Sequence, residues 1–291
     1  MKAMRRVFQT FFRSPWQPAS VIAVVFSCVC SVQPPAYSQE MFAPGETLRY
    51  KVRWSFIRLG TVEIHQNTVD PRIPEAREFT LLVKSAKGLP FINLDITHTV
   101  SASLNPLEAK RLVVENGDGQ QEKTTYEMNH ARQEIIVVDS ACGTEVLRDT
   151  ISIAERCYEA LCLLFLARSH ASRTGTVVVP TVVSKAVGET ILHFTGESEE
   201  IDVPAFEDPI EAYHFTGDAR WVGDGFGGMK GQFEGWVSRD QAAVPLRAEV
   251  GIFLGSIVLE LESYERSSWR PLDTASLSPS QPQEGGSPWQ R

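Results

Sequence analysis

Apolar and polar residues alternate one by one along most of this chain. From Leu48 to Trp54 every second residue is apolar, and the residues between them are arginine or lysine. A period of two is typical of a β-strand that buries one face. Further strands are predicted at 61–65, 79–86, 94–104, 109–115, 123–129, 134–138, 176–184, 189–194, 199–203, 211–215, 230–238, 246–252 and 256–264. The connections are short and contain asparagine, glycine, aspartate or proline, which predicts antiparallel neighbours.

One segment has a different pattern. Residues 154–170 are apolar on nearly all sides of a helix, and Ser152 followed by Glu155 has the spelling of a capping box with Ser152 as N-cap. Glu155 and Arg168, near the ends of this segment, argue against a membrane span. A helix that is apolar nearly all round is predicted to be buried between layers.

These elements predict a mainly β fold. We expect a large, curved antiparallel sheet or open (half) barrel, with one buried helix at 154–170 packed against its concave side. The physical reason is burial, because the strands supply one apolar face and the helix needs cover on more than one side.

The two ends of the chain differ from the part that alternates. Residues 1–38 have a basic start, an apolar run at 21–32 and small residues before Gln39, which predicts a signal peptide cleaved after Ser38. Lipidation at Cys28 is the less favoured alternative. Residues 39–266 are expected to form a single β-rich domain, and the Pro/Ser-rich residues 267–291 a disordered tail. The protein is therefore expected to be exported to the periplasm of a Gram-negative envelope.

Charge and cysteine content narrow the classes of partner. The chain has 28 basic and 36 acidic residues, and removing a leader with four basic and no acidic residues changes the net charge from −8 to −12. A chain with this net negative charge is not expected to bind nucleic acid or anionic lipid surfaces. Outside the leader the cysteines are Cys142, Cys157 and Cys162. Free thiols are favoured, although Cys142 could pair with either of the others.

A glycine-rich stretch has the spelling of a nucleotide-binding loop. Gly223, Gly225 and Gly228 form G-x-G-x-x-G, but residues 230–238 alternate as a strand, whereas a phosphate-binding loop leads into a helix. We therefore predict a turn and no nucleotide site. The histidines lack metal-ligand spacing and there is no G-x-S-x-G, so the sequence predicts neither a metal, a cofactor nor catalytic residues.

Four stretches of the sequence resemble a known family. These are "GETLRYKVRWSFIRLGTVEI" at 45–64, "CYEALCLLFLARS" at 157–169, "EEIDVPAFEDPIEAYHF" at 199–215 and "GQFEGWVSRDQAAVPLRAEVGIFLGSIVLELESYE" at 231–265. Together they are similar to the bacterial exported family catalogued as domain of unknown function 3108. The resemblance implies an exported β-rich protein and carries over no catalytic residues. Its strand pattern is similar to the open half-barrels that ferry lipoproteins and lipids across the periplasm.

A non-catalytic binding or carrier protein for an apolar or amphiphilic envelope ligand is the function that we expect. The alternatives are a structural or interaction module that binds an envelope protein and, less favoured, an envelope-acting hydrolase. A curved sheet can leave an apolar cavity, which a lipid or another amphiphile would occupy. The expected cavity residues are the large aromatic ones: Trp54, Phe56, Phe91, Phe165, Phe233, Trp236 and Phe253.

Overall fold

The computed structural model describes residues 39–67, 76–89, 93–104, 106–117, 122–221, 231–252, 255–267 and 269. The leader 1–38, the glycine-rich stretch at 222–230, the candidates Phe91 and Phe253, and most of the tail lie outside the described residues.

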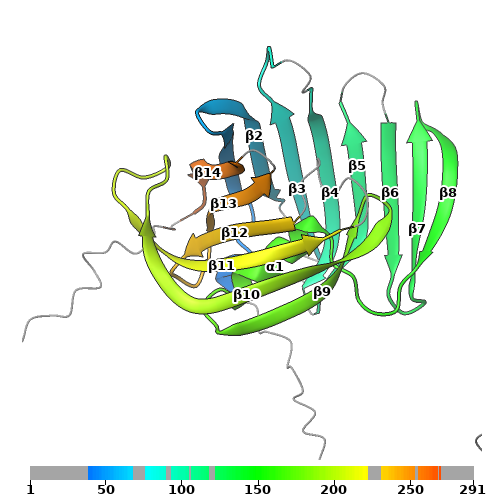
Figure 1. The fold of residues 1–291 in the computed structure, drawn as a ribbon. Helices are drawn as coiled ribbons and strands as arrows, with labels where there is room; N and C mark the ends of the chain where they lie inside the picture. The colour runs from blue at the N-terminus through cyan, green and yellow to red at the C-terminus, as the bar shows by residue number, and fades with distance from the viewer. Residues whose placement is uncertain are drawn as a thin grey trace, which may run out of the picture. The chain divides into compact units, whose positions relative to one another are not determined.

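The described residues form one antiparallel sheet of fourteen strands (Figure 1). The first eight strands are β1 Thr47–Trp54, β2 Ile57–Gln66, β3 Ala76–Ser85, β4 Asp95–Leu104, β5 Leu107–Asn116, β6 Glu122–Asn129, β7 Glu134–Ala141 and β8 Thr144–Ser152. After the helix α1 (Ala160–His170) follow β9 Gly175–Val183, β10 Ala186–Ile201, β11 Ile210–Arg220, β12 Gly231–Ser238, β13 Pro245–Ile252 and β14 Gly255–Glu265. A short 3-10 helix, η1 (Gln39–Met41), precedes β1.

The order of the strands explains why the sheet is open. Strands that are neighbours in the chain pair with each other, except β8 and β9, and β1 also pairs with β14, so that the outermost strands of the sheet are β8 and β9. These two strands are consecutive in the chain, but α1 and its connections lie between them instead of a tight turn. Figure 1 shows the sheet bent so that its two halves face each other across α1. The predicted curved, unclosed sheet with one buried helix on its concave side is confirmed.

The sheet has two ends that differ in how the strands are connected. At the end that we call the helix end, β8 leads into α1 and α1 leads into β9. At the other, which we call the hairpin end, two-residue turns at 55–56, 142–143 and 184–185 join β1 to β2, β7 to β8 and β9 to β10.

The helix fills the concave face at the helix end. Phe165 is fully buried, and its ring centroid lies 4.5 Å from that of Phe79 in β3 and 4.9 Å from that of Phe42. The helix begins at Ala160, later than the predicted 154, and its N-cap is Glu159, whose carboxylate accepts hydrogen bonds from the backbone N–H groups of Leu161 and Cys162. The prediction of Ser152 as N-cap was wrong, because Ser152 ends strand β8.

The two outermost strands are the places where the sequence pattern is weakest. Strand β8 was not predicted, because it is exposed along almost its whole length and so has no alternating apolar face. Strand β9 contains Pro180, which an outermost strand tolerates. The backbone of Tyr158 bonds to Pro180 and Val182 and so covers part of the free side of β9.

Strands β10 and β12 correspond to three of the predicted strands. The strands predicted at 189–194 and 199–203 are parts of the single strand β10, which keeps its pairing with β11 through a register shift between Phe194 and Ser198. Gly196 lies in this shift with a φ of 72°, a conformation that favours glycine. The strand predicted after the glycine-rich stretch is confirmed, because β12 begins at Gly231.

Candidate functional site

The concave face of the sheet changes character between its two ends. Near the helix end its side chains are buried beneath α1, as Leu48 and Tyr50 of β1 are. Towards the hairpin end the same face continues with side chains that are apolar but only half-buried. We call this set the concave strip; it consists of Val52, Trp54, Val62, Val83, Ile96, Phe233, Val250, Ile257 and Leu259.

Cross-strand pairing places these residues on one face. Buried Tyr50 stands opposite Val62, which pairs with Val83, which in turn pairs with Ile96. Directly paired residues point to the same face of a sheet, so these side chains share the face that α1 covers lower down.

The other half of the strip follows from a second row of pairs. Trp54 stands opposite Ile257 of β14, Ile257 opposite Val250 of β13, and Val250 opposite Phe233 of β12. The ring of Phe233 lies over Gly217 of β11, where a Cβ would collide with it. Glycine at 217 therefore lets an aromatic ring lie flat along the concave wall.

The opposite face of the same strands is charged. The guanidinium of Arg53 donates two hydrogen bonds to the carboxylate of Glu260, at 2.9 and 2.8 Å, and Lys51 lies 3.4 Å from it. The hydrogen bond from Arg53 lowers the pKa of Glu260. Strands β1 and β14 thus present paired charges on one side and the concave strip on the other.

The predicted cavity residues are divided between different parts of the molecule. Trp54 and Phe233 belong to the concave strip. Phe56 is 92% exposed in the turn between β1 and β2. Phe165 packs in the core under the helix end. Trp236 lies on the opposite face of the sheet, where the guanidinium of Arg247 lies 5.2 Å from its ring centroid.

One titratable side chain lies at the border between the buried core and the strip. His98 of β4 stands between Leu81 and Val114 on the concave face. Burial lowers the pKa of His98 to about 4, so its imidazole is neutral at pH 7.

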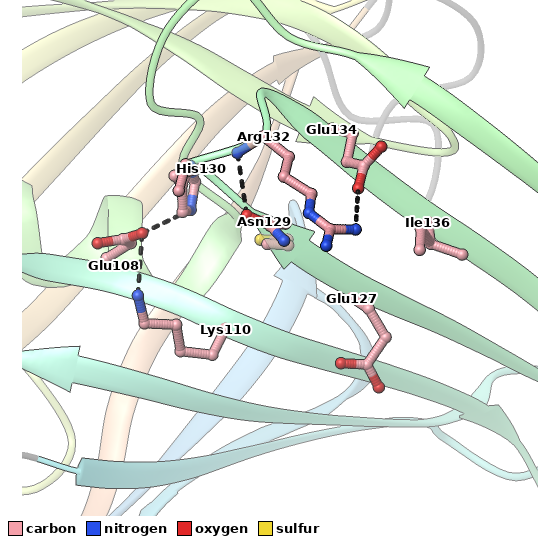
Figure 2. A pocket seen from close by; sticks show the side chains of 10 residues that line it. Glu108, Lys110, Glu127, Asn129, His130, Arg132, Glu134 and Ile136 are labelled. Atoms are coloured by element: carbon pink, nitrogen blue, oxygen red, sulfur yellow. Dashed lines mark hydrogen bonds and ion pairs between the residues drawn. The ribbon is translucent and has the colours of Figure 1, made fainter.

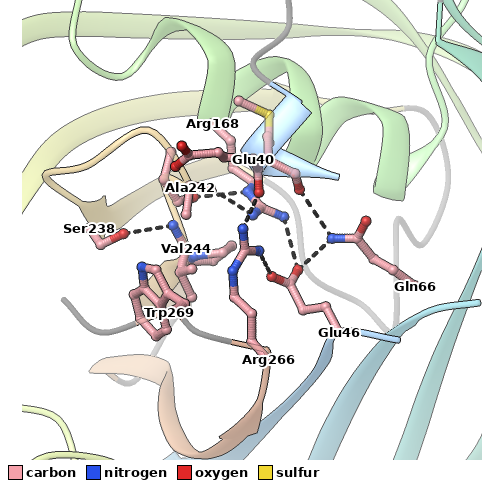
Figure 3. A network of polar contacts seen from close by, with 12 residues as sticks. Glu40, Glu46, Gln66, Arg168, Ser238, Ala242, Val244, Arg266 and Trp269 are labelled. Atoms are coloured by element: carbon pink, nitrogen blue, oxygen red, sulfur yellow. Dashed lines mark hydrogen bonds and ion pairs between the residues drawn. The ribbon is translucent and has the colours of Figure 1, made fainter. Parts of the chain in front are cut away.

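A buried network of charges fixes the helix end (Figure 3). The Glu46 carboxylate accepts a hydrogen bond from Gln66 Nε2 and pairs with two arginines, Arg168 of α1 at 3.5 Å and Arg266 after β14. Arg168 also donates hydrogen bonds of 2.8 Å to the carbonyl oxygens of Ala242 and Ala243. The network therefore ties α1 to both ends of the described chain and to the connection between β12 and β13.

The structure also has an open pocket of about 440 Å³ on β5, β6 and β7, and half of the ten residues that line it are charged (Figure 2). In it the Glu108 carboxylate forms an ion pair with Lys110 Nζ at 3.0 Å and lies 3.4 Å from His130 Nε2. A second pocket, of about 220 Å³, lies beside Arg168. Neither pocket is lined by residues of the concave strip.

A cysteine near the first of these pockets does not supply an activated nucleophile. Burial, together with the nearby carboxylate of Glu159, raises the pKa of the Cys162 thiol well above its usual value. Burial likewise raises the pKa of Cys157 to about 11. Both thiols are therefore protonated at pH 7 and poorly nucleophilic. Cys142, Cys157 and Cys162 form no disulfide in the described chain, and Cys142 is exposed.

The described residues contain neither a cluster of metal ligands nor a membrane-spanning helix. No group of three or more His, Cys, Asp or Glu side chains is arranged to hold a metal ion. No helix in the described part of the chain is long and apolar enough to cross a membrane.

Comparison with known proteins gives a family and similar structures. The model of the family described as protein of unknown function (DUF3108) matches residues 49–262. No curated protein matches the sequence. A β-barrel-like protein of domain of unknown function DUF1849 from Brucella abortus is 9% identical, covers 77% of this chain and 98% of its own, and has a TM-score of 0.48. The lipoprotein LppX from Mycobacterium tuberculosis is 11% identical, covers 77% of this chain and 88% of its own, and has a TM-score of 0.20.

Proposed function

This chain belongs to the DUF3108 family, and we propose that it is a non-catalytic binding or carrier protein for an apolar or amphiphilic ligand held against the concave strip. The observation that carries this proposal is the strip itself. Seven strands bring half-buried apolar side chains together on the inner face of an open sheet, and α1 covers only the other end of that face.

The environment that we propose is the bacterial envelope. The basic and apolar leader at 1–38 supports export, with cleavage after Ser38. The Pro/Ser-rich composition of 267–291 supports a tail, although Trp269 within it packs on Tyr264 and donates a hydrogen bond to Asp240 of the domain. An exported carrier meets lipids and other amphiphiles, which match the apolar character of the strip.

Two features support a protein that binds rather than catalyses. The buried thiols are protonated, and the Glu108–His130 pair has no activated nucleophile among its described neighbours. The concave strip contains only apolar side chains, which supply binding energy by burial but no acid, base or nucleophile.

A second candidate, an envelope interaction module, has one observation in its favour. Strand β8 is exposed on its free side and carries Val146 and Leu147, which are 69% and 53% exposed. A free sheet edge of this kind can pair with a strand of another protein.

The substitution Val83→Glu tests the carrier proposal. It places a carboxylate among Val62 and Ile96, where an apolar ligand would have to desolvate it. We expect the variant to bind a fluorescent fatty acid at least about tenfold more weakly than the wild type, which corresponds to about 1.4 kcal/mol or more.

Leu147→Glu is the matched control, because it adds the same charge at an exposed apolar position on β8. It is expected to bind the fatty acid as the wild type does, and circular dichroism would check that both variants are folded. Equal binding by the folded Val83→Glu variant and the wild type would reject the concave strip as the site.

A further inference from the structure

Large apolar side chains are exposed at the hairpin end of the sheet. Phe56 is 92% exposed at the turn between β1 and β2, Leu94 is 38% exposed just before β4, and Ile252 is 36% exposed at the end of β13. We call these three residues the apolar rim. Single exposed apolar side chains are common on protein surfaces, but several at one end of a sheet indicate a surface that contacts another molecule.

The three rim residues lie close together along the sheet. Leu94 precedes β4, Phe56 joins β2 to β1 and Ile252 ends β13, with one strand, β3 or β14, between each of these places and the next. The backbone N–H of Ser85 donates to the carbonyl of Leu94 at 2.9 Å, and Ala86 N–H donates to the carbonyl of Leu59, three residues beyond Phe56, at 2.7 Å. On the other side, Ile252 pairs with Gly255, which lies beside the indole of Trp54.

The rim also adjoins the concave strip. Trp54 closes the turn that carries Phe56, and Trp54 is itself a residue of the strip. The rim and the concave strip therefore meet at Trp54.

The backbone holds Phe56 outward at some cost. Ser55, the first residue of the turn, has a φ of 53°, in the left-handed region where residues other than glycine and asparagine are uncommon. A two-residue turn of this kind leaves the Phe56 side chain at its tip instead of folding it against the sheet.

Charge near the rim differs from charge on the rest of the chain. Near the rim most basic side chains are paired with acidic ones: Arg53 with Glu260, Arg58 with Glu262 and Lys84 with Asp95. These pairs leave no excess of negative charge beside the rim, whereas the whole chain has a net charge of −8. A phosphate-bearing surface can approach this end of the sheet without meeting that excess.

From these observations we infer that the apolar rim docks on a phospholipid surface. Phe56, Leu94 and Ile252 insert among the lipids at the level of the headgroups, and the concave strip then opens directly towards the bilayer. Burial of apolar side chains supplies the attachment, so it survives salt that would screen charges. The inference rests on the rim and does not require that a ligand be bound to the strip.

Sedimentation with phosphatidylcholine vesicles tests this inference. We expect the purified protein to pellet with the vesicles at low and at high salt. The Phe56→Ser variant should bind on the order of tenfold more weakly, because it lacks the aromatic side chain whose burial in lipid stabilises the attachment. Val146→Ser is the matched control, since Val146 is 69% exposed on β8, and it is expected to pellet as the wild type does.

Three outcomes would overturn the inference. They are a wild-type protein that stays in the supernatant, a Phe56→Ser variant that pellets as well as the wild type, and a Val146→Ser variant that loses as much binding as Phe56→Ser. Fatty-acid binding by the same samples separates this result from the proposed function. If the fatty acid still binds while the vesicles do not, the docking surface is rejected and the carrier proposal stands.

Discussion

Replacement of Glu46 by alanine is expected to lower the free energy of unfolding by about 3–5 kcal/mol, the usual cost of breaking a buried ion pair. The Glu46 and Arg168 side chains are each 1% exposed, and that of Arg266 is 5% exposed. Without the carboxylate, two buried guanidinium groups lose their counter-charge. Burial already lowers the pKa of Arg168, and the charge of Glu46 opposes that effect.

Denaturant unfolding followed by circular dichroism measures this change. The control is Glu63→Ala, which removes the 2.6 Å ion pair with Arg49, an arginine whose side chain is 46% exposed. An exposed pair contributes about 0–1 kcal/mol, so this variant should remain close to the wild type. If Glu46→Ala cost no more than Glu63→Ala, the network would not be what holds α1 at the helix end.

The second large effect that we expect is a loss of stability in acid caused by His98. Its pKa is about 4 in the folded protein and about 6.5 when exposed to water, so the unfolded chain binds the proton more tightly. Stability from this difference is complete above pH 6.5 and is lost as the pH falls through about 4. A difference of this size corresponds to about 3 kcal/mol.

His98→Gln separates this effect from the titration of the carboxylates. The free energy of unfolding would be measured for the wild type and the variant at several values between pH 7 and pH 4. We expect the wild type to lose more stability than the variant over this range, because glutamine does not titrate. Parallel curves would show that the imidazole is not desolvated on the concave face.

Alternation of apolar and polar residues predicted the fold well, because every strand that buries only one face shows this alternation in its sequence. It failed for β8, whose residues are exposed on both faces. The start of α1 was placed too early, because the buried Ile153 and Cys157 of the connection continue the apolar pattern of the helix. Local sequence contains no signal that the buried Glu159 carboxylate, and not Ser152, caps the helix.

The candidate site was only partly predictable for a related reason. Side-chain size pointed to Trp54 and Phe233, which lie in the concave strip, but also to Trp236, which lies on the other face. The aliphatic residues Val52 and Val62 were missed, although Val52 has the same parity in its strand as Leu48 and Tyr50. Parity shows which residues share a face, but only the packed position of α1 shows how far along that face the cover extends.

The central claim is that the concave strip holds an apolar or amphiphilic molecule, and organic extraction of the protein purified from the cells that make it tests this most directly. Mass spectrometry of the extract should find a lipid or other amphiphile in an amount comparable to the protein, and markedly less in the Val83→Glu variant prepared in the same way. An extract of the wild type without such a molecule, or with the same amount as the folded Val83→Glu variant, would contradict the claim.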